Sequence, residues 1–342
     1  MKTGVLIINT GTPDAPTLPC VRAYLREFLS DPAIIGAPEF IRKRIVNHAV
    51  KHRPLRTVEH YKNFWTEDGS PFMLTSLKQR DRLAIELNGR IAEPTQVALA
   101  MRYGNPSIEA GLRQLMEGAC ERVVLLPLYP QNVNVCAGTC LKRAHEVLSE
   151  LAAQGWQPEV LEVTSFHDQP AYRKALANSV RKVWEYEPGS KLMVSFHSTM
   201  LADIKRDDTY LVQCTQTRDW LADDLGIPRD DVTLSFQSRF DSRKWLQPFT
   251  EKLLVGMRAQ GVSRVCVVCP GFVADNIETM IEVNQDLRGT FCAPKTPGHA
   301  GQTDDRAVVA AIKDLDFTYV PALNTSAGLI FALADAVCEV LA

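Results

Sequence analysis

Residues 121–129 read ERVVLLPLY, and this run decides the fold class because its apolar residues are continuous rather than alternating with polar ones. Continuous runs of valine, isoleucine and leucine are typical of parallel strands that are buried on both faces. Similar runs recur on both sides of it, each followed by turn residues and a helical pattern. The predicted strands are 4–9, 96–103, 121–129, 159–166, 191–197, 231–237, 263–269 and 317–323.

Helical patterns alternate with these strands, which predicts doubly wound α/β units with parallel sheets. Four strands fall in each half, so we predict two similar units, with a boundary near 163–168. An apolar helix is expected at 326–342, and the polar stretch 293–305 is the best candidate for a flexible loop. The other predicted helices are 76–88, 107–118, 139–153, 170–185, 214–225 and 247–260.

The composition is that of an ordinary globular protein, with 46% hydrophobic and 23% charged residues over a length that suits two domains. The 38 basic and 40 acidic side chains give a net charge of −2, so nothing favours nucleic acid and an anionic ligand needs local basic groups. Nine cysteines, with no secretory leader in the first residues, favour a reducing cytoplasm and free thiols.

The ends of two predicted strands carry the residues of greatest chemical interest, because ligands bind beyond the carboxyl ends of parallel strands. Strand 191–197 ends in His197, and strand 263–269 leads toward a helix expected to begin near Asp275. On that helix Asp275, Glu278 and Glu282 are three and four residues apart, which places three carboxylates on one face. A histidine facing these acids can bind a divalent metal or move protons.

A structural interpretation of the same residues stays open at this point. Asp275 and Glu278 also form the pattern of a helix N-terminal capping box, and His197 can be a hydrogen-bonded, half-buried imidazole. Two cysteine pairs are weaker candidates for a site. Cys266 and Cys269 lie in a predicted buried strand, and Cys136 and Cys140 lack the further ligands of a tetrahedral site. No glycine-rich phosphate loop is present, which argues against nucleotide binding.

Residues 38–54 (PEFIRKRIVNHAVKHRP) combine apolar and basic side chains on one predicted helix. One interpretation is a surface that contacts a membrane or a hydrophobic ligand, and the other is an amphipathic helix whose apolar side covers the core. The apolar face holds Phe40, Ile41, Ile45 and Ala49, and the basic neighbours are Arg42, Lys43, Arg44, Lys51 and Arg53.

The sequence resembles the ferrochelatases, in the branch common in Gram-negative bacteria. The matching segments follow one another in order along nearly the whole chain. They are LIINTGTPDAPT (6–17), YLREFLSDP (24–32), WTEDGSPF (65–72), AMRYGNPSIE (100–109), VLLPLYPQ (124–131), VSFHS (194–198), LSFQSRF (234–240), KWLQPFT (244–250), CPGFVADNIET (269–279) and YVPALN (319–324).

The resemblance implies two Rossmann-like domains with a porphyrin cleft between them. They are expected at 1–165, with a C-terminal helix at 325–342 packing back on this domain, and at 166–324. It further implies insertion of Fe²⁺ into a porphyrin, protoporphyrin IX first, in the last steps of haem biosynthesis. The alternatives are coproporphyrin III, another metal such as cobalt or nickel, and a non-catalytic porphyrin- or haem-binding paralogue.

The resemblance also assigns roles by position. His197 matches the active-site histidine and Glu278 the glutamate opposite it, as the catalytic and metal-binding pair. Asp275 and Glu282 match an acidic path beside them for protons or metal. Thr10, Arg102, Tyr103 and Trp245 match porphyrin-binding positions, and candidate partners for the porphyrin's propionates are Arg26, Arg102 and Lys244.

The chain departs from the family pattern around the expected pocket. Ser198–Leu201 and Asn132–Gly138 differ from the usual segments, and Thr10 and Asn276 replace other residues. Iron is expected as substrate with no tightly bound cofactor, and Cys292 and Cys338 are too far apart in sequence to suggest an iron–sulfur cluster. The expected protein is a monomer or homodimer, with residues 38–54 as its one candidate for membrane contact.

Overall fold

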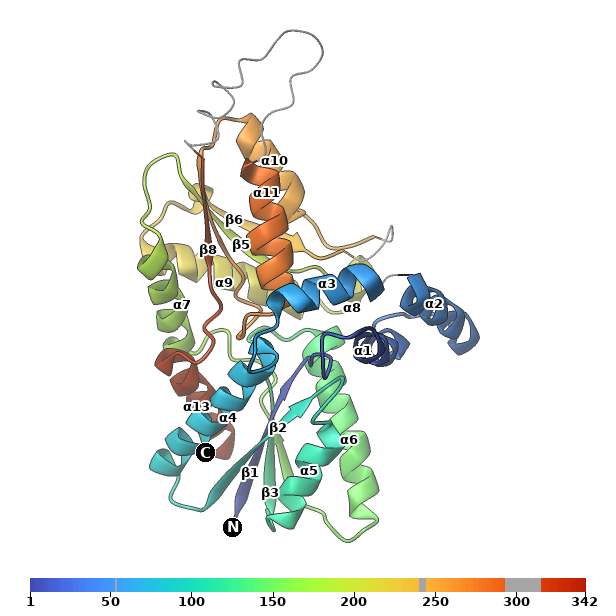
Figure 1. Ribbon diagram of the computed structural model, residues 1–342. Coiled ribbons are helices and arrows are strands. Elements are labelled where there is room, and N and C mark those ends of the chain that lie inside the picture. Colours follow the sequence, from blue (N-terminus) through green and yellow to red (C-terminus); the bar gives the residue numbers. More distant parts are fainter. Residues whose placement is uncertain (53, 240–243, 293–314) are drawn as a thin grey trace. The chain divides into compact units, whose positions relative to one another are not determined.

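The computed structural model describes residues 1–52, 54–239, 244–292 and 315–342, so the loop predicted at 293–305 lies outside the described residues. The chain forms two compact units (Figure 1). Unit 1 consists of Met1–Tyr172, Phe272–Ile277 and Leu323–Ala342, and unit 2 of Arg173–Gly271 and Glu278–Ala322. Both ends of the chain therefore belong to unit 1.

Each unit contains a four-stranded parallel sheet, as the continuous apolar runs predict. In unit 1 the strands β1 (Thr3–Asn9), β2 (Thr95–Met101), β3 (Arg122–Pro127) and β4 (Glu159–Glu162) are ordered β2-β1-β3-β4. In unit 2 the strands β5 (Lys191–His197), β6 (Val232–Gln237), β7 (Arg264–Val268) and β8 (Asp316–Val320) are ordered β6-β5-β7-β8. All eight predicted strands and the α/β fold class are confirmed.

The two sheets have the same strand order, which fixes where each is expected to bind a ligand. In both, the first strand lies between the second and the third, so the order of connection reverses between β1 and β3 and between β5 and β7. Open α/β sheets bind ligands in the crevice at the carboxyl ends of such strands. The residues that follow β1, β3, β5 and β7 are therefore the ones that the fold singles out.

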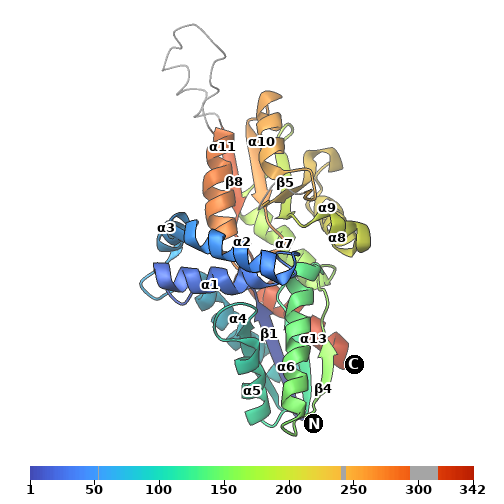
Figure 2. The same ribbon diagram turned by 90° about the vertical axis from the view of Figure 1, so that its right-hand side faces the viewer.

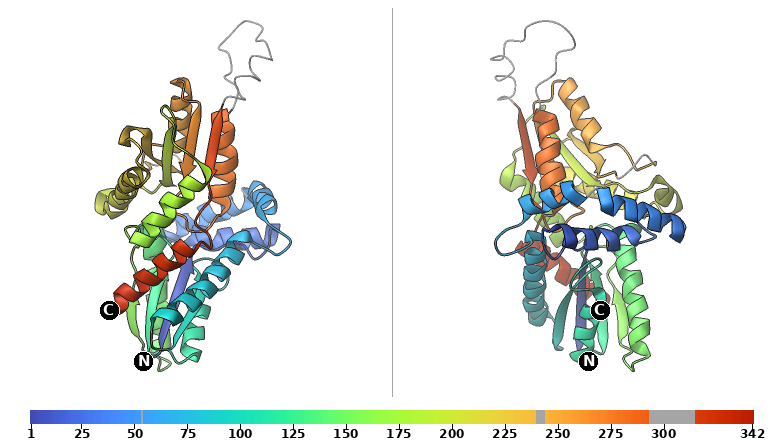
Figure 3. Two further views of the ribbon diagram at one scale, coloured as in Figure 1. Left: turned by 90° about the vertical axis from the view of Figure 1, so that its left-hand side faces the viewer. Right: turned by 45° about the vertical axis from the view of Figure 1, so that its right-hand side comes forward.

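Helices cover both faces of the first sheet (Figures 1 and 2). On β1, Leu6 and Ile8 pack in one core with α5 (Ile108–Glu117) and α6 (Thr139–Ala152). The alternate residues Val5 and Ile7 are also fully buried and point to the opposite face, where α4 (Pro71–Arg90) and α13 (Ala327–Leu341) pack side by side (Figure 3). The remaining helices of unit 1 are α1 (Leu18–Ser30), α2 (Glu39–His52), α3 (Pro54–Phe64) and the π-helix η1 (Asn134–Gly138).

The buried face of α13 leads to a prediction about stability. Leu333 is fully buried, whereas Phe331 on the same helix is 43% exposed. We expect Leu333→Ala to lower the free energy of unfolding by about 2–5 kcal/mol, because it removes packed methyl groups and leaves a cavity. Chemical denaturation measures this loss. Phe331→Ala is the control, and an equal loss in both variants would contradict the packing described for α13.

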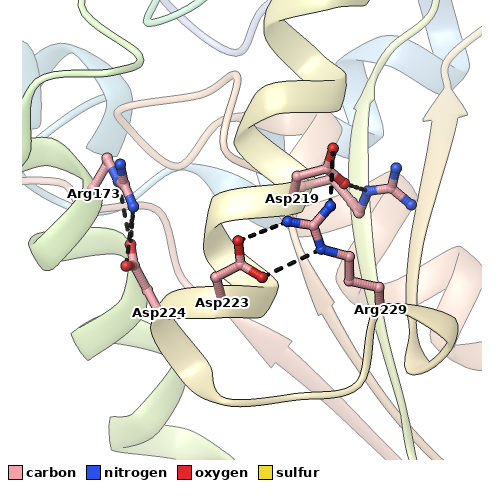
Figure 4. A network of polar contacts seen from close by, with 6 residues as sticks. Arg173, Asp219, Asp223, Asp224 and Arg229 are labelled. Atoms are coloured by element: carbon pink, nitrogen blue, oxygen red, sulfur yellow. Dashed lines mark hydrogen bonds and ion pairs between the residues drawn. The ribbon is translucent and has the colours of Figure 1, made fainter.

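Unit 2 is built from α7 (Pro170–Val183), α8 (Leu201–Arg206), α9 (Thr209–Leu225), the 3-10 helix η2 (Arg229–Asp231), α10 (Thr250–Ala259), the π-helix η3 (Glu278–Leu287) and α11 (Arg288–Cys292). Ion pairs fasten the C-terminal end of α9 (Figure 4). Arg173 of α7 pairs with Asp224 at 3.0 Å, and Arg229 of η2 pairs with Asp223 at 2.7 Å. Because these groups are partly exposed to solvent, they stabilise the unit only weakly.

Candidate active site

His197 is the last residue of β5, at the switch point of the second sheet. Burial lowers the pKa of its side chain, so the imidazole is neutral near pH 7. Its Nδ1 lies 2.6 Å from the backbone oxygen of Ser198. A carbonyl oxygen can only accept, so Nδ1 carries the single proton and Nε2 carries the lone pair. His197 is therefore held in the tautomer that can act as a base or metal ligand through Nε2.

A network of buried hydrogen bonds joins the side chains near His197 at the ends of β5 and β6. Gln237 of β6 pairs in register with His197, and its side-chain oxygen accepts a hydrogen bond from Ser195 at 2.6 Å. Ser195 also lies 2.8 Å from the hydroxyl of Thr250, which donates to Ser235 at 3.0 Å. The hydroxyl of Tyr210 donates to the backbone oxygen of His197 at 2.9 Å. These bonds hold the carboxyl ends of β5 and β6 in fixed positions.

Glu278 follows β7, the strand on the other side of the switch point, and is the first residue of η3. Burial raises its pKa to about 7, and the like charge of Glu282 adds to this shift. Glu282 accepts hydrogen bonds from the backbone N–H of Ser238, at 2.8 Å, and from its hydroxyl. Burial also raises the pKa of Glu282, and these two bonds oppose that rise. The site thus contains a carboxyl group that changes charge near neutral pH.

The expectation of one helical face with Asp275, Glu278 and Glu282 is wrong in part. The described π-helix begins at Glu278, and Asp275 precedes it in unit 1. There the carboxylate of Asp275 accepts a hydrogen bond from the Asn324 side chain at 2.8 Å, while its backbone N–H donates to Asn324 Oδ1 at 2.9 Å. This reciprocal pairing holds Asp275 to the segment just before α13.

Two further acids, Asp286 and Glu251, lie near Glu282, and sequence reasoning missed both. The charges of Asp286 and Glu251 act on Glu282 and help to raise its pKa. Asp286 lies on η3 four residues after Glu282, so the repeated spacing of Glu278, Glu282 and Asp286 was the available sequence signal. Glu251 comes from α10, and no sequence signal connected it with these acids. Both are exposed, whereas Glu278 and Glu282 are partly buried, so these acids lead from a partly buried carboxyl group to solvent.

The predicted porphyrin-binding residues of unit 1 lie at the carboxyl edge of the first sheet. Thr10 follows β1, and its hydroxyl lies 2.5 Å from the hydroxyl of Tyr129, which follows β3. This pair therefore spans the first switch point. Arg102 and Tyr103 follow β2, and their backbone N–H groups donate to the carbonyls of Asn9 and Thr10. Thr10, Arg102 and Tyr103 thus lie together.

Trp245 belongs to unit 2, where its side chain is buried and its backbone forms an isolated bridge with Met200. Its contact with a porphyrin remains a prediction. Cys266 and Cys269 are both buried, as expected of small apolar residues in and after a central strand. Within the described ranges, no three His, Cys, Asp or Glu side chains are grouped to hold a metal ion.

Solved structures show the class of fold that these sheets define. The chain is similar to SirB from Bacillus subtilis with Fe³⁺, with a TM-score of 0.55 and 9% identity, over 100% of this chain and 96% of that one. It is also similar to the sirohydrochlorin chelatase SirB from Bacillus subtilis subspecies spizizenii in complex with cobalt, with a TM-score of 0.53 and 10% identity, over 99% and 95% of the two chains. The architecture is therefore that of the chelatase-like α/β proteins.

Sequence comparison then gives the family. The ferrochelatase family model matches residues 2–297. The ferrochelatase of Chromobacterium violaceum is 39% identical over 100% of this chain and 88% of its own length. Ferrochelatase 2 of Shewanella oneidensis is 36% identical over 98% of this chain and 97% of its own length. The chain belongs to the ferrochelatase family.

Proposed function

We propose that the protein inserts Fe²⁺ into a porphyrin in the last steps of haem biosynthesis, with protoporphyrin IX as its substrate. One observation carries this proposal. The strands on either side of a single switch point lead to a neutral imidazole, His197, and to a carboxyl group that titrates near pH 7, Glu278. Family membership supports the same reaction class.

The chemistry requires groups of these two kinds. Two pyrrole N–H protons must leave the porphyrin as the metal enters, so the enzyme needs a base close to the ring. We assign this role to Nε2 of His197. Carboxylate and imidazole ligands suit Fe²⁺ and leave coordination positions open for transfer, so we assign iron binding to Glu278 together with His197. Because Nε2 has a single lone pair, His197 releases iron to the ring before the same atom takes a pyrrole proton. Glu282 then carries protons outward toward Asp286 and solvent, or metal inward along the same path.

Substrate contacts complete the proposal. The residues proposed to contact the macrocycle are Thr10, Arg102, Tyr103 and Trp245. For Asp275, a role in the path for protons or metal is proposed from its family position alone. A bent macrocycle is closer to the transition state for metallation than a flat one, so packed side chains around the ring contribute to the rate as well as to binding. Iron is a substrate here, and we propose that no resident cofactor or iron–sulfur cluster is needed.

The test is an anaerobic assay of purified protein with Fe²⁺ and either protoporphyrin IX or coproporphyrin III, followed by absorbance. We expect metallation of protoporphyrin IX at the higher kcat/KM. Porphyrin binding without metallation would contradict the proposal and support a carrier or sensor. Faster insertion of Co²⁺ or Ni²⁺ than of Fe²⁺ would redirect it to another metal.

Helix α2 supports a finer proposal about location. Phe40, Ile41 and Ile45 are 69%, 39% and 43% exposed, whereas Val46 and Val50 are buried. The interpretation in which Phe40, Ile41 and Ile45 cover the core is therefore wrong. In the described part of the chain no helix is long and apolar enough to cross a membrane. We propose a cytoplasmic protein that touches an anionic membrane surface through this face of α2.

Vesicle binding tests this contact. We expect the double substitution Phe40→Ser and Ile45→Ser to weaken binding to vesicles containing anionic phospholipid by about tenfold or more, because two apolar side chains no longer enter the bilayer surface. Cosedimentation measures the change. Ile85→Ser is the matched control, since Ile85 is 76% exposed on α4. Equal binding by all three proteins would exclude α2 as the contact.

A further inference from the structure

Asp31, which follows α1, holds a buried carboxylate that no sequence pattern singled out. Its side chain is 6% exposed. Oδ1 accepts a hydrogen bond from the backbone N–H of Ala33 at 2.8 Å. Oδ2 accepts from the Tyr103 hydroxyl at 3.0 Å and from the guanidinium of Arg102, with which it forms an ion pair. Two of the proposed porphyrin contacts therefore share one carboxylate.

Neighbouring residues on one face of α1 fix Asp31 in this position. The hydroxyl of Tyr24 donates to the Gly11 carbonyl at 3.2 Å, and Glu27 accepts from the backbone N–H of Gly104 at 3.0 Å. The ring of Phe28 meets Tyr103 edge to face at 5.1 Å between centroids. Tyr24, Glu27, Phe28 and Asp31 are three, four and seven residues apart, which is the spacing of one helical face. Helix α1 is thus fastened to the segments that follow β1 and β2.

The ion pair with Asp31 compensates the positive charge of Arg102. Its side chain is 17% exposed, and its guanidinium lies over the Tyr103 ring at 4.5 Å, in addition to the pair with Asp31. An unpaired charge at such a depth is strongly destabilising, so the carboxylate and the guanidinium depend on each other. Burial raises the pKa of Tyr103, which keeps its hydroxyl protonated as a donor to Asp31. This edge of the sheet presents a neutral pair instead of a free cation.

We infer that Asp31 is a positioning residue that neutralises Arg102 and makes the unit 1 site selective for a porphyrin edge without carboxylates. The inference rests on the proposed function, because it assumes that the macrocycle contacts Arg102 and Tyr103. It narrows the substrate class to porphyrins whose carboxylates are confined to one edge, such as a dicarboxylic porphyrin. A tetracarboxylic porphyrin would bring a negative group to a site that offers it no unbalanced positive charge.

The test compares affinities for protoporphyrin IX, with two carboxylates, and coproporphyrin III, with four, by fluorescence titration. Asp31→Asn keeps the shape of the side chain and one of its two acceptor oxygens but leaves the charge of Arg102 unbalanced. We expect the affinity for coproporphyrin III relative to protoporphyrin IX to rise about tenfold at low salt, as Coulomb attraction near a protein surface allows. The gain should shrink as salt is added.

The matched control is Asp81→Asn, which also removes one carboxylate from an arginine: the exposed Asp81 pairs with its neighbour Arg80 at 2.6 Å. It should leave the ratio of the two affinities unchanged. The double variant Asp31→Asn with Arg102→Gln restores neutrality and should return the ratio to the wild-type value. Arg102→Gln alone leaves Asp31 unbalanced and should shift the ratio about tenfold in the opposite direction.

Each outcome separates this inference from the proposed function. Wild-type protein that binds and metallates protoporphyrin IX, with the same affinity ratio in Asp31→Asn, overturns the inference alone. Wild-type protein that binds neither porphyrin overturns both. If Asp31→Asn does not fold, the opposite shift in Arg102→Gln and the restored ratio in the double variant decide the question. A ratio that changes without any dependence on salt points to a purely structural role and also overturns the inference.

Discussion

Replacing His197 with alanine is expected to lower kcat for iron insertion by about 10²–10⁴-fold, the usual contribution of a positioned base, while the porphyrin Kd changes little. The imidazole is neutral, and its Nδ1 proton is bonded to the Ser198 carbonyl, so alanine removes the Nε2 lone pair that we assign to the pyrrole protons. Stopped-flow absorbance and porphyrin fluorescence measure the two quantities separately.

His145→Ala is the matched control for this variant. His145 is an exposed histidine of unit 1 that pairs with Glu162, far from β5 in the sequence. Its removal should leave kcat unchanged. Wild-type turnover in the His197 variant would remove this residue from the chemistry, and loss of porphyrin binding together with kcat would make it a binding residue instead.

Glu278 carries the second large expected effect, which appears in the pH profile. Its pKa is about 7, so the carboxylate that binds iron forms only as the pH rises through neutrality. The pKa of His197 is lowered, so this imidazole is already neutral over the same range. We therefore expect kcat/KM for Fe²⁺ to rise with pH through about 7, and Glu278→Gln to abolish this limb with at least about a hundredfold loss of activity. An unchanged limb in the variant would assign the titration to another group.

Stability measurements distinguish lost chemistry from a damaged fold in this variant. The pKa of Glu278 is 4.5 when the side chain is in water and about 7 in the folded protein, so the folded state binds its proton more tightly. Between these values stability falls as the pH rises, by up to about 3 kcal/mol in total. Glutamine does not ionise, so Glu278→Gln should be more stable than wild type at pH 8 and show no such gain at pH 4. A variant less stable at both pH values would indicate disruption.

The sheets were predictable because their information is local. An apolar run such as 121–129 encodes a buried parallel strand in its own residues, and the end of a strand marks the switch point that holds His197. The acids of η3 were found for the same reason, since their spacing is short. The π-helix itself was missed because apolar periodicity does not encode its wider turn.

Distant contacts explain the remaining errors. Asp275 is held by Asn324, 49 residues later, and Arg102 pairs with Asp31, 71 residues earlier. Neither separation leaves a trace in local spacing. On α2, Val46 and Val50 are buried while Phe40 and Ile45 are exposed, although all four are apolar. Which apolar side chains meet the core depends on tertiary packing that a helical period cannot choose alone.

The return of the chain to unit 1 has a consequence for synthesis on the ribosome. Helix α13 follows the last strand of the second sheet and supplies Leu329, Leu333 and Val337 to the interior of unit 1. The first sheet and α4 are translated early, yet the part of the sheet face that α13 covers stays exposed until these last residues emerge. The nascent chain therefore exposes an apolar surface for most of its elongation, and such surfaces attract chaperones and promote aggregation.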